Sequence, residues 1–213
     1  MSTETNRPRT PGEAWAALRE GNDRFVRGEM VHPSQDAAHR AALSSSQQPF
    51  AVVFGCSDSR VASEIVFDQG LGDAFVVRTA GHVIDTTVLG SIEYGVEVLG
   101  VPLVVVLAHD QCGAVAAAAQ TLASGEQAPG FVRAVGDRVI PSIVGLTSSG
   151  RPLSSFDAAE LGHEHLRQTA HMLAGYSALL SERTADGRCA IVAVEYTLAD
   201  GRAQLVETVG RLD

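Results

Sequence analysis

The sequence predicts an α/β fold with a mainly parallel central β-sheet flanked by helices. Short apolar runs rich in β-branched residues alternate along the chain with longer segments of helical composition. Within each run the apolar residues are continuous rather than alternating with polar ones. That pattern is typical of strands covered on both faces, as the strands of parallel sheets are.

The chain is expected to hold one domain, over residues 12–213, because its 213 residues suit a single hydrophobic core. Residues 1–11 are polar and lack the apolar stretch of a secretory signal, so a disordered leader is expected there.

Two helices are expected before the first strand. Residues 11–21 have helical composition, and Gly21 is expected to end or interrupt this helix. If the helix continues, one of its faces would carry Trp15, Leu18 and Phe25. A second, polar helix is expected over residues 35–45.

The remaining elements alternate as an α/β fold requires. Five strands are expected, at residues 50–55, 74–78, 103–108, 190–196 and 204–209, the last of them at a sheet edge. Three helices are expected at residues 86–99, 113–124 and 158–181. The tract from 125 to 155 is rich in Gly, Pro and Ser and is expected to be loop, with some helix near 131–144.

Composition argues against several classes of protein. The net charge of −9 and the scattered basic residues argue against a nucleic-acid partner. The longest apolar tract, near residues 96–108, is interrupted and too short to span a bilayer, so no membrane association is expected. Three cysteines do not suggest a disulfide framework and suit a reducing, cytoplasmic setting.

Candidate metal ligands follow two of the expected strands. Cys56, Asp58 and Arg60 come directly after one strand, and His109 and Cys112 come directly after another. The carboxyl ends of parallel strands are where open sheets build their sites. Two thiolates, an imidazole and a carboxylate would form a tetrahedral zinc site, although spacing alone does not show that the distant Cys56 joins the other ligands.

Other cysteines and histidines are assigned structural positions. Cys189 lies within the apolar run 189–194 and is expected in the core. The segment His163-Glu164-His165 lacks the i, i+4 spacing of a helical zinc motif. With its charged neighbours it is interpreted as the solvated face of a helix, together with Glu160, Arg167 and His171.

The two ligand segments resemble the signature motifs of the β-class carbonic anhydrases. The resemblance extends through 73–81 and 91–95 to nearly the whole chain, residues 12–210, and the tract 67–85 is most similar to actinobacterial members. It implies one zinc per chain, held by Cys56, His109 and Cys112. It also implies reversible hydration of carbon dioxide to bicarbonate and a proton by zinc-bound hydroxide. N-terminal helices would pack on a neighbouring subunit of a homodimer or homotetramer.

Asp58 has two possible roles in such a site. As a fourth zinc ligand it would close the site to water. Paired with Arg60, it would leave that position open and orient the attacking hydroxide. A rise in pH would favour the open arrangement, because hydroxide competes with the carboxylate for the metal.

The resemblance also implies a substrate pocket. Its residues would be Gly113 beside the second motif, Phe75 and Tyr94 as an aromatic wall, and Gln47 reaching the site of an adjoining subunit. One departure lies after the second strand, where many members have Asn-x-Ala-Asn and this chain has Thr79-Ala80-Gly81-His82. Here His82 is interpreted as a structural histidine rather than a proton relay.

Two alternatives remain open from the motifs. Relatives with the same ligands hydrolyse carbonyl sulfide or carbon disulfide, and a non-catalytic zinc scaffold could keep the ligands alone. A scaffold would not need the Asp58–Arg60 pair or Gln47.

Overall fold

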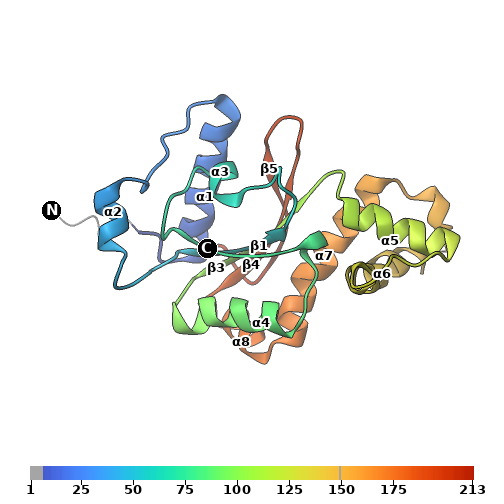
Figure 1. Cartoon of the computed structure of the whole chain (residues 1–213). Coiled ribbons are helices and arrows are strands. Elements are labelled where there is room, and N and C mark those ends of the chain that lie inside the picture. Colours follow the sequence, from blue (N-terminus) through green and yellow to red (C-terminus); the bar gives the residue numbers. More distant parts are fainter. Residues whose placement is uncertain (1–6, 149) are drawn as a thin grey trace.

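The computed structural model describes residues 7–148 and 150–213, and its centre is a five-stranded sheet (Figure 1). The strand order is β2-β1-β3-β4-β5. The first four strands run parallel, and β5 pairs antiparallel with β4. These elements confirm the predicted fold class and all five predicted strands, which are β1 (Ala51–Cys56), β2 (Ala74–Thr79), β3 (Leu103–His109), β4 (Ala190–Tyr196) and β5 (Ala203–Val209).

Helices cover both faces of the sheet. Figure 1 shows α1 (Pro11–Arg27) on one side of it, and α4 (Thr86–Glu93) and α8 (Ala178–Ala185) on the other. The long helix α7 (Ala158–Tyr176) packs on the same side as α4. Alternate residues of the central strands enter the two resulting apolar clusters, so both faces are buried as continuous apolar runs require.

The first helix continues through Gly21 to Arg27, so the expectation that Gly21 ends or interrupts it is wrong. A β-carbon at position 21 would lie 1.7 Å from the carbonyl oxygen of Phe67. Glycine is therefore needed here for close approach of the helix to the chain after α3 (Ser63–Val66), a short helix that the sequence did not suggest. The helix ends instead at Gly28, which has a φ of 69°.

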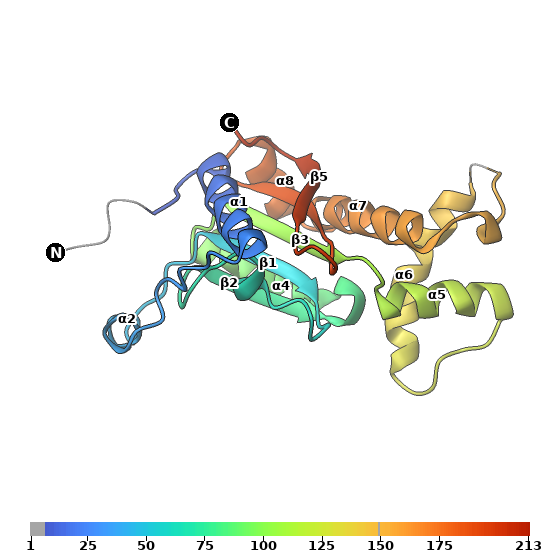
Figure 2. The same cartoon turned by 90° about the horizontal axis from the view of Figure 1, so that it is seen from above.

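The apolar face of α1 packs on the chain's own sheet. Trp15 and Leu18 are buried in the cluster on that side, with Phe25 packed against it. Whether another face of α1 also contacts a neighbouring subunit stays a prediction. The polar helix α2 (Ala37–Ala42) has no buried residue, and Figure 2 shows it held away from the sheet. Contact of α2 with a neighbour stays a prediction.

Two of the expected helices differ from the structure in their continuity. The helix expected over 86–99 is α4 followed by a π-helical turn, Tyr94–Val98. The helix expected over 158–181 is broken at Ser177, whose backbone is extended and whose hydroxyl caps α8 by accepting from the Leu180 amide. The same hydroxyl donates to Glu93 at 2.6 Å, and this contact fixes the break.

A helical lobe extends beyond the carboxyl ends of the strands (Figure 2). It holds α5 (Gly113–Ser124), α6 (Val132–Thr147) and the short turn Leu153–Ser155. The helix expected near 131–144 is therefore confirmed as α6, which is sixteen residues long. Its buried residues Val139 and Ile143 pack in one cluster with Cys56 and Cys112, so the lobe covers the strand ends where the candidate ligands lie.

At the amino terminus, residues 1–6 of the predicted leader lie outside the described residues. Thr10 caps α1, since its hydroxyl accepts from the Glu13 amide and the Glu13 carboxylate accepts from the Thr10 amide. Across the described ranges, none of the helices combines the length and apolar character needed to cross a bilayer.

Candidate metal centre

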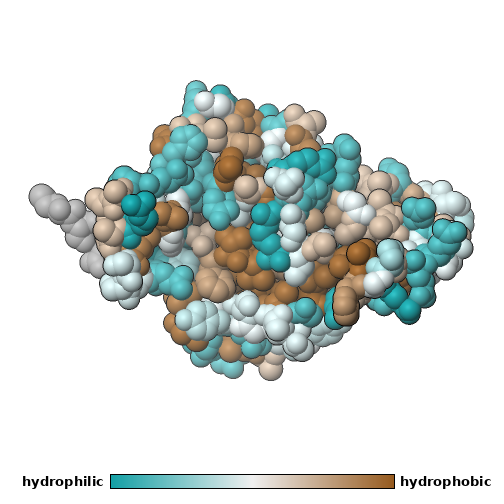
Figure 3. Space-filling model, viewed as in Figure 1, coloured by the Kyte–Doolittle hydropathy of each residue, from teal (hydrophilic) through white to brown (hydrophobic). Residues whose placement is uncertain are grey.

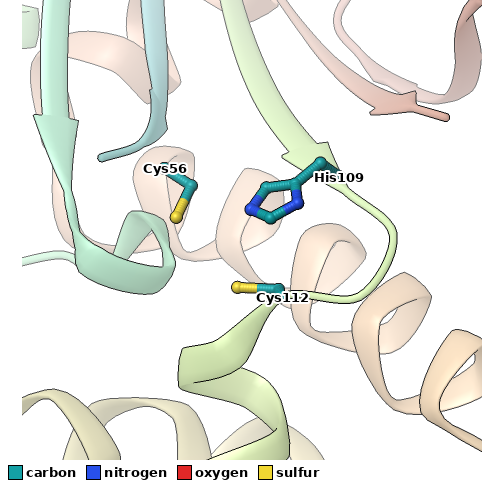
Figure 4. Close-up of side chains that lie close together, drawn as sticks. All are labelled: Cys56, His109 and Cys112. Carbon is teal, nitrogen blue, oxygen red and sulfur yellow. The ribbon is translucent and has the colours of Figure 1, made fainter. Parts of the chain in front are cut away.

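The ends of two neighbouring strands bring three ligand side chains together. In the parallel pairing of β1 with β3, Gly55 lies opposite Leu107, so the carboxyl ends of the two strands lie side by side. Cys56 ends β1, His109 ends β3, and Cys112 immediately precedes α5. Their ligand atoms all lie within 4.8 Å of one another and converge on one space (Figure 4).

One nitrogen of the His109 imidazole is available to bind a metal ion. Nδ1 lies 2.7 Å from the carbonyl oxygen of Asp110, which can only accept, so Nδ1 carries the proton. This leaves Nε2 with a free lone pair. Nε2 is buried and has no hydrogen-bond partner among the described residues. A buried unpaired nitrogen is costly unless a ligand binds it, so the site fits a metal ion.

The two sulfurs also fit a metal ion. The neighbouring Cys112 lowers the pKa of Cys56, although burial opposes the effect. Contact with Cys56 and burial raise the pKa of Cys112. A metal ion needs both sulfurs as thiolates, so a divalent ion would displace the protons that they carry. Two soft thiolates with an imidazole favour zinc over hard cations such as magnesium.

Cys189 behaves as predicted and takes no part in the cluster. It is fully buried within the sheet, and burial raises the pKa of its thiol to about 12. A thiol in such surroundings stays protonated and inert. It offers a matched control for substitutions of Cys56 and Cys112.

Asp58 is paired with Arg60. The guanidinium donates from Nε to Oδ1 at 2.9 Å and from Nη2 to Oδ2 at 2.7 Å, and the Arg60 amide donates to Oδ1 at 2.9 Å. These bonds hold the pKa of the Asp58 carboxyl well below its usual range. Oδ2 lies 3.7 Å from His109 Nε2, beyond hydrogen-bond distance but beside the cluster. Of the two partners considered for Asp58, the structure shows the pairing with Arg60.

The predicted pocket residues are not all beside the cluster. Gly113 begins α5 next to Cys112. Phe75 and Tyr94 lie together, with ring centroids 6.0 Å apart, but Phe75 pairs with Val52, about 13 Å along the strands from the level of Cys56. Gln47 is exposed in the segment before β1. Within one chain, only Gly113 of these four adjoins the ligands.

Sequence reasoning missed three residues that support the site. Arg78 donates from Nε to the Cys56 carbonyl at 2.9 Å and from Nη2 to the Asp58 carbonyl at 2.7 Å, which holds the ligand loop on β2. Gly81 donates its amide to the Cys56 sulfur. His165, interpreted as part of a solvated face, is buried and bonded to Gly81. A signal was available, because the buried residues of α7 recur at helical spacing along one face. His165 lies on this face, with Leu161, Leu166, Thr169, Ala170 and Leu173.

Known proteins resemble this chain along almost its whole length. A sequence model of the carbonic anhydrase family matches residues 51–203. The chain is 55% identical to carbonic anhydrase 2 of Mycobacterium tuberculosis over 95% of this chain and 96% of that protein. It is 54% identical to the carbonic anhydrase of Mycolicibacterium smegmatis, covering 94% and 95%.

Solved structures share the fold at lower identity. A Coccomyxa β-carbonic anhydrase in complex with acetazolamide aligns with a TM-score of 0.68 at 19% identity, covering 92% of this chain and 86% of that one. One of two tetrameric β-carbonic anhydrases from Sordaria macrospora aligns with a TM-score of 0.69 at 18% identity, covering 90% and 96%.

The geometry predicts one zinc ion per chain. Each of the variants Cys56→Ala and His109→Ala loses a zinc ligand. Loss of a residue that merely supports a ligand lowers metal affinity by up to about 100-fold, so each variant should lower zinc affinity by more than that. Zinc content after chelator competition measures this loss. Cys189→Ala should keep full zinc content. Full zinc occupancy in Cys56→Ala would show that the cluster is not the site.

Proposed function

The chain belongs to the β-class carbonic anhydrase family, and on this basis we propose how its residues catalyse the reversible hydration of carbon dioxide to bicarbonate and a proton. Cys56, His109 and Cys112 would hold the zinc ion. When bound, zinc supplies a Lewis acid that lowers the pKa of a coordinated water toward ~7. The observation that carries the proposal is the buried, unpartnered His109 Nε2 facing two sulfurs and the Asp58–Arg60 pair.

Asp58 and Arg60 would position the attacking water. Arg60 holds the carboxylate by two side-chain hydrogen bonds, so the direction of its oxygens is fixed. From beside the cluster, Asp58 can accept a hydrogen bond from the water and orient its lone pair toward the carbon of the substrate. Because its pKa is held well below the usual range, Asp58 remains an acceptor at neutral pH.

Gly113 would lie on the substrate side of the cluster. It opens α5, whose amino-terminal amides carry the positive end of the helix dipole, and this end favours the negative charge that develops on the product. A β-carbon built on Gly113 would meet nothing within 4 Å, so there is space beside it for a small molecule.

The remaining pocket residues would act on a partner's site. β2 is an edge strand, and its side chains from Phe75 to Val77 are partly exposed. Figure 3 shows an apolar band at the level of the sheet, and Tyr94 in the adjoining turn is 45% exposed. An uncovered apolar sheet edge favours association. We propose that a second copy covers this edge, and that Gln47, Phe75 and Tyr94 complete the partner's pocket in a homodimer or homotetramer.

The cytoplasm is the compartment that we propose for the enzyme. Its three cysteines are free thiols, and the proposed function needs two of them as thiolates. A reducing compartment keeps them available for metal.

The first test of the proposed function measures substrate choice. The zinc-loaded protein should accelerate carbon dioxide hydration in a stopped-flow assay, and Cys56→Ala should return the rate to the uncatalysed background. Carbonyl sulfide hydrolysis is followed in parallel. Faster release of sulfide than hydration of carbon dioxide would reassign the substrate, and zinc binding without either activity would identify a scaffold.

A second test addresses the carboxylate. Arg60→Ala frees Asp58 to bind the metal, so hydration should fall about 10–100-fold while zinc is retained. Asp58 stays ionised across roughly pH 6 to 9, since its pKa is lowered, so the pH dependence cannot come from its protonation. It should come from hydroxide competing with Asp58 for the fourth ligand position, which makes wild-type activity low near neutrality and higher at mildly alkaline pH.

Arg188→Ala is the matched control for the second test. Arg188 contacts Asp186, two residues earlier, through its amide at 3.0 Å and Nε at 2.8 Å, as Arg60 contacts Asp58. Its removal should leave the rate unchanged. Wild-type activity in Arg60→Ala throughout this pH range would contradict the proposed role of the pair.

A third test asks whether subunits complete each other's pockets. Cys56→Ala lacks its own metal site but keeps Gln47, and Gln47→Ala has the reverse defect. After the two inactive chains are unfolded together and refolded, half of the dimers should be mixed, with one whole site each. Activity should then recover to about a quarter of wild type. No recovery, or a fully active monomer in sedimentation at assay concentration, would exclude a pocket shared between chains.

A further inference from the structure

The turn after β2 places a backbone amide on one of the metal-binding sulfurs. Gly81 donates its N–H to Cys56 Sγ at 3.3 Å. Its φ of 66° lies in the left-handed region, and a β-carbon there would lie 2.7 Å from the β-carbon of Ala114. The amide can reach the sulfur because position 81 has no side chain.

His165 holds the same glycine from its other side. Its Nε2 lies 2.9 Å from the Gly81 carbonyl oxygen, and its Nδ1 lies 3.1 Å from the Ser142 hydroxyl. A carbonyl only accepts, so Nε2 carries the proton and Nδ1 accepts from Ser142. The Gly81 carbonyl thereby fixes the tautomer of His165 on α7, and the Ser142 hydroxyl on α6 holds the other ring nitrogen. The chain of contacts runs from Ser142 through His165 and Gly81 to Cys56.

The ring of His82 fixes the plane of the His165 imidazole. The centroids of the His82 and His165 rings are 4.5 Å apart, and the rings of Phe54 and His82 are nearly perpendicular, with centroids 6.5 Å apart. Burial lowers the pKa of both histidines, so both rings are neutral in the folded protein. His165 is 1% exposed and cannot turn toward solvent. Its orientation toward Gly81 is therefore set by packing as well as by hydrogen bonds.

We propose that His165 is a positioning residue for the metal centre, which through Gly81 directs an N–H at the Cys56 sulfur and so limits how much electron density this ligand donates to zinc. The inference rests on the proposed function, because it requires a metal on Cys56. A hydrogen bond to a thiolate withdraws charge from sulfur, and partners outside the ligand shell commonly alter metal affinity or activity by 10–100-fold.

The test uses cobalt(II) in place of zinc, since the energy of its thiolate-to-metal charge-transfer band reports electron donation by sulfur. His165→Leu removes the donor to Gly81, so the band should move to lower energy and zinc affinity in chelator competition should change by about tenfold or more. His165→Gln keeps an amide N–H that can reach the same carbonyl and should restore the wild-type band. Ser142→Ala should shift the band in the same direction as His165→Leu, by less.

His163→Leu is the matched control, because His163 is a half-exposed histidine on the same helix with no contact to Gly81. The charge-transfer band of the His163→Leu variant should match that of the wild-type protein. An unshifted band and unchanged zinc affinity in His165→Leu would overturn the inference. If His165→Leu does not fold, an unshifted band in Ser142→Ala would overturn the inference instead. Failure of the wild-type protein to bind cobalt or zinc would instead overturn the proposed function.

Discussion

The parallel pairing of β1 with β3 is the interaction on which the metal centre depends. Cys56 and His109 are 53 positions apart in the sequence, and only this pairing brings the two strand ends to one edge of the sheet. A slip of one residue in the register would turn Cys56 to the opposite face. The continuous burial of both strands prevents such a slip, because every side chain of β1 and β3 is packed in the core.

The position of the third ligand, Cys112, depends on a turn that is local in the sequence. Cys112 returns to the cluster through a tight turn in which Gln111 has a φ of 53°, and α5 starts directly after it. The lobe then covers the sulfurs with apolar side chains of α6. Shielding from water strengthens electrostatic interactions among the buried ligands.

The strands could be predicted because their signals are local, since each is a short apolar run. The complete ligand set came from the resemblance to the β-class carbonic anhydrases, because spacing alone does not show that Cys56 joins His109 and Cys112. The features that escaped prediction depend on contacts between distant segments. Gly21 looks like a helix stop until Phe67 is placed against it, and Ser177 looks helical until Glu93 accepts its hydroxyl. His165 looks solvated beside charged neighbours, because its partner Gly81 is 84 residues away.

Natural variation of the turn after β2 is limited by the contact between Gly81 and Ala114. Any side chain at position 81 would add a β-carbon 2.7 Å from that of Ala114, on a backbone that other residues rarely adopt. Relief would require movement of α5, and α5 begins directly after the metal ligand Cys112. The alanine that many members of the family carry at this position therefore requires a wider spacing between the turn and α5, so the turn and the start of α5 change together.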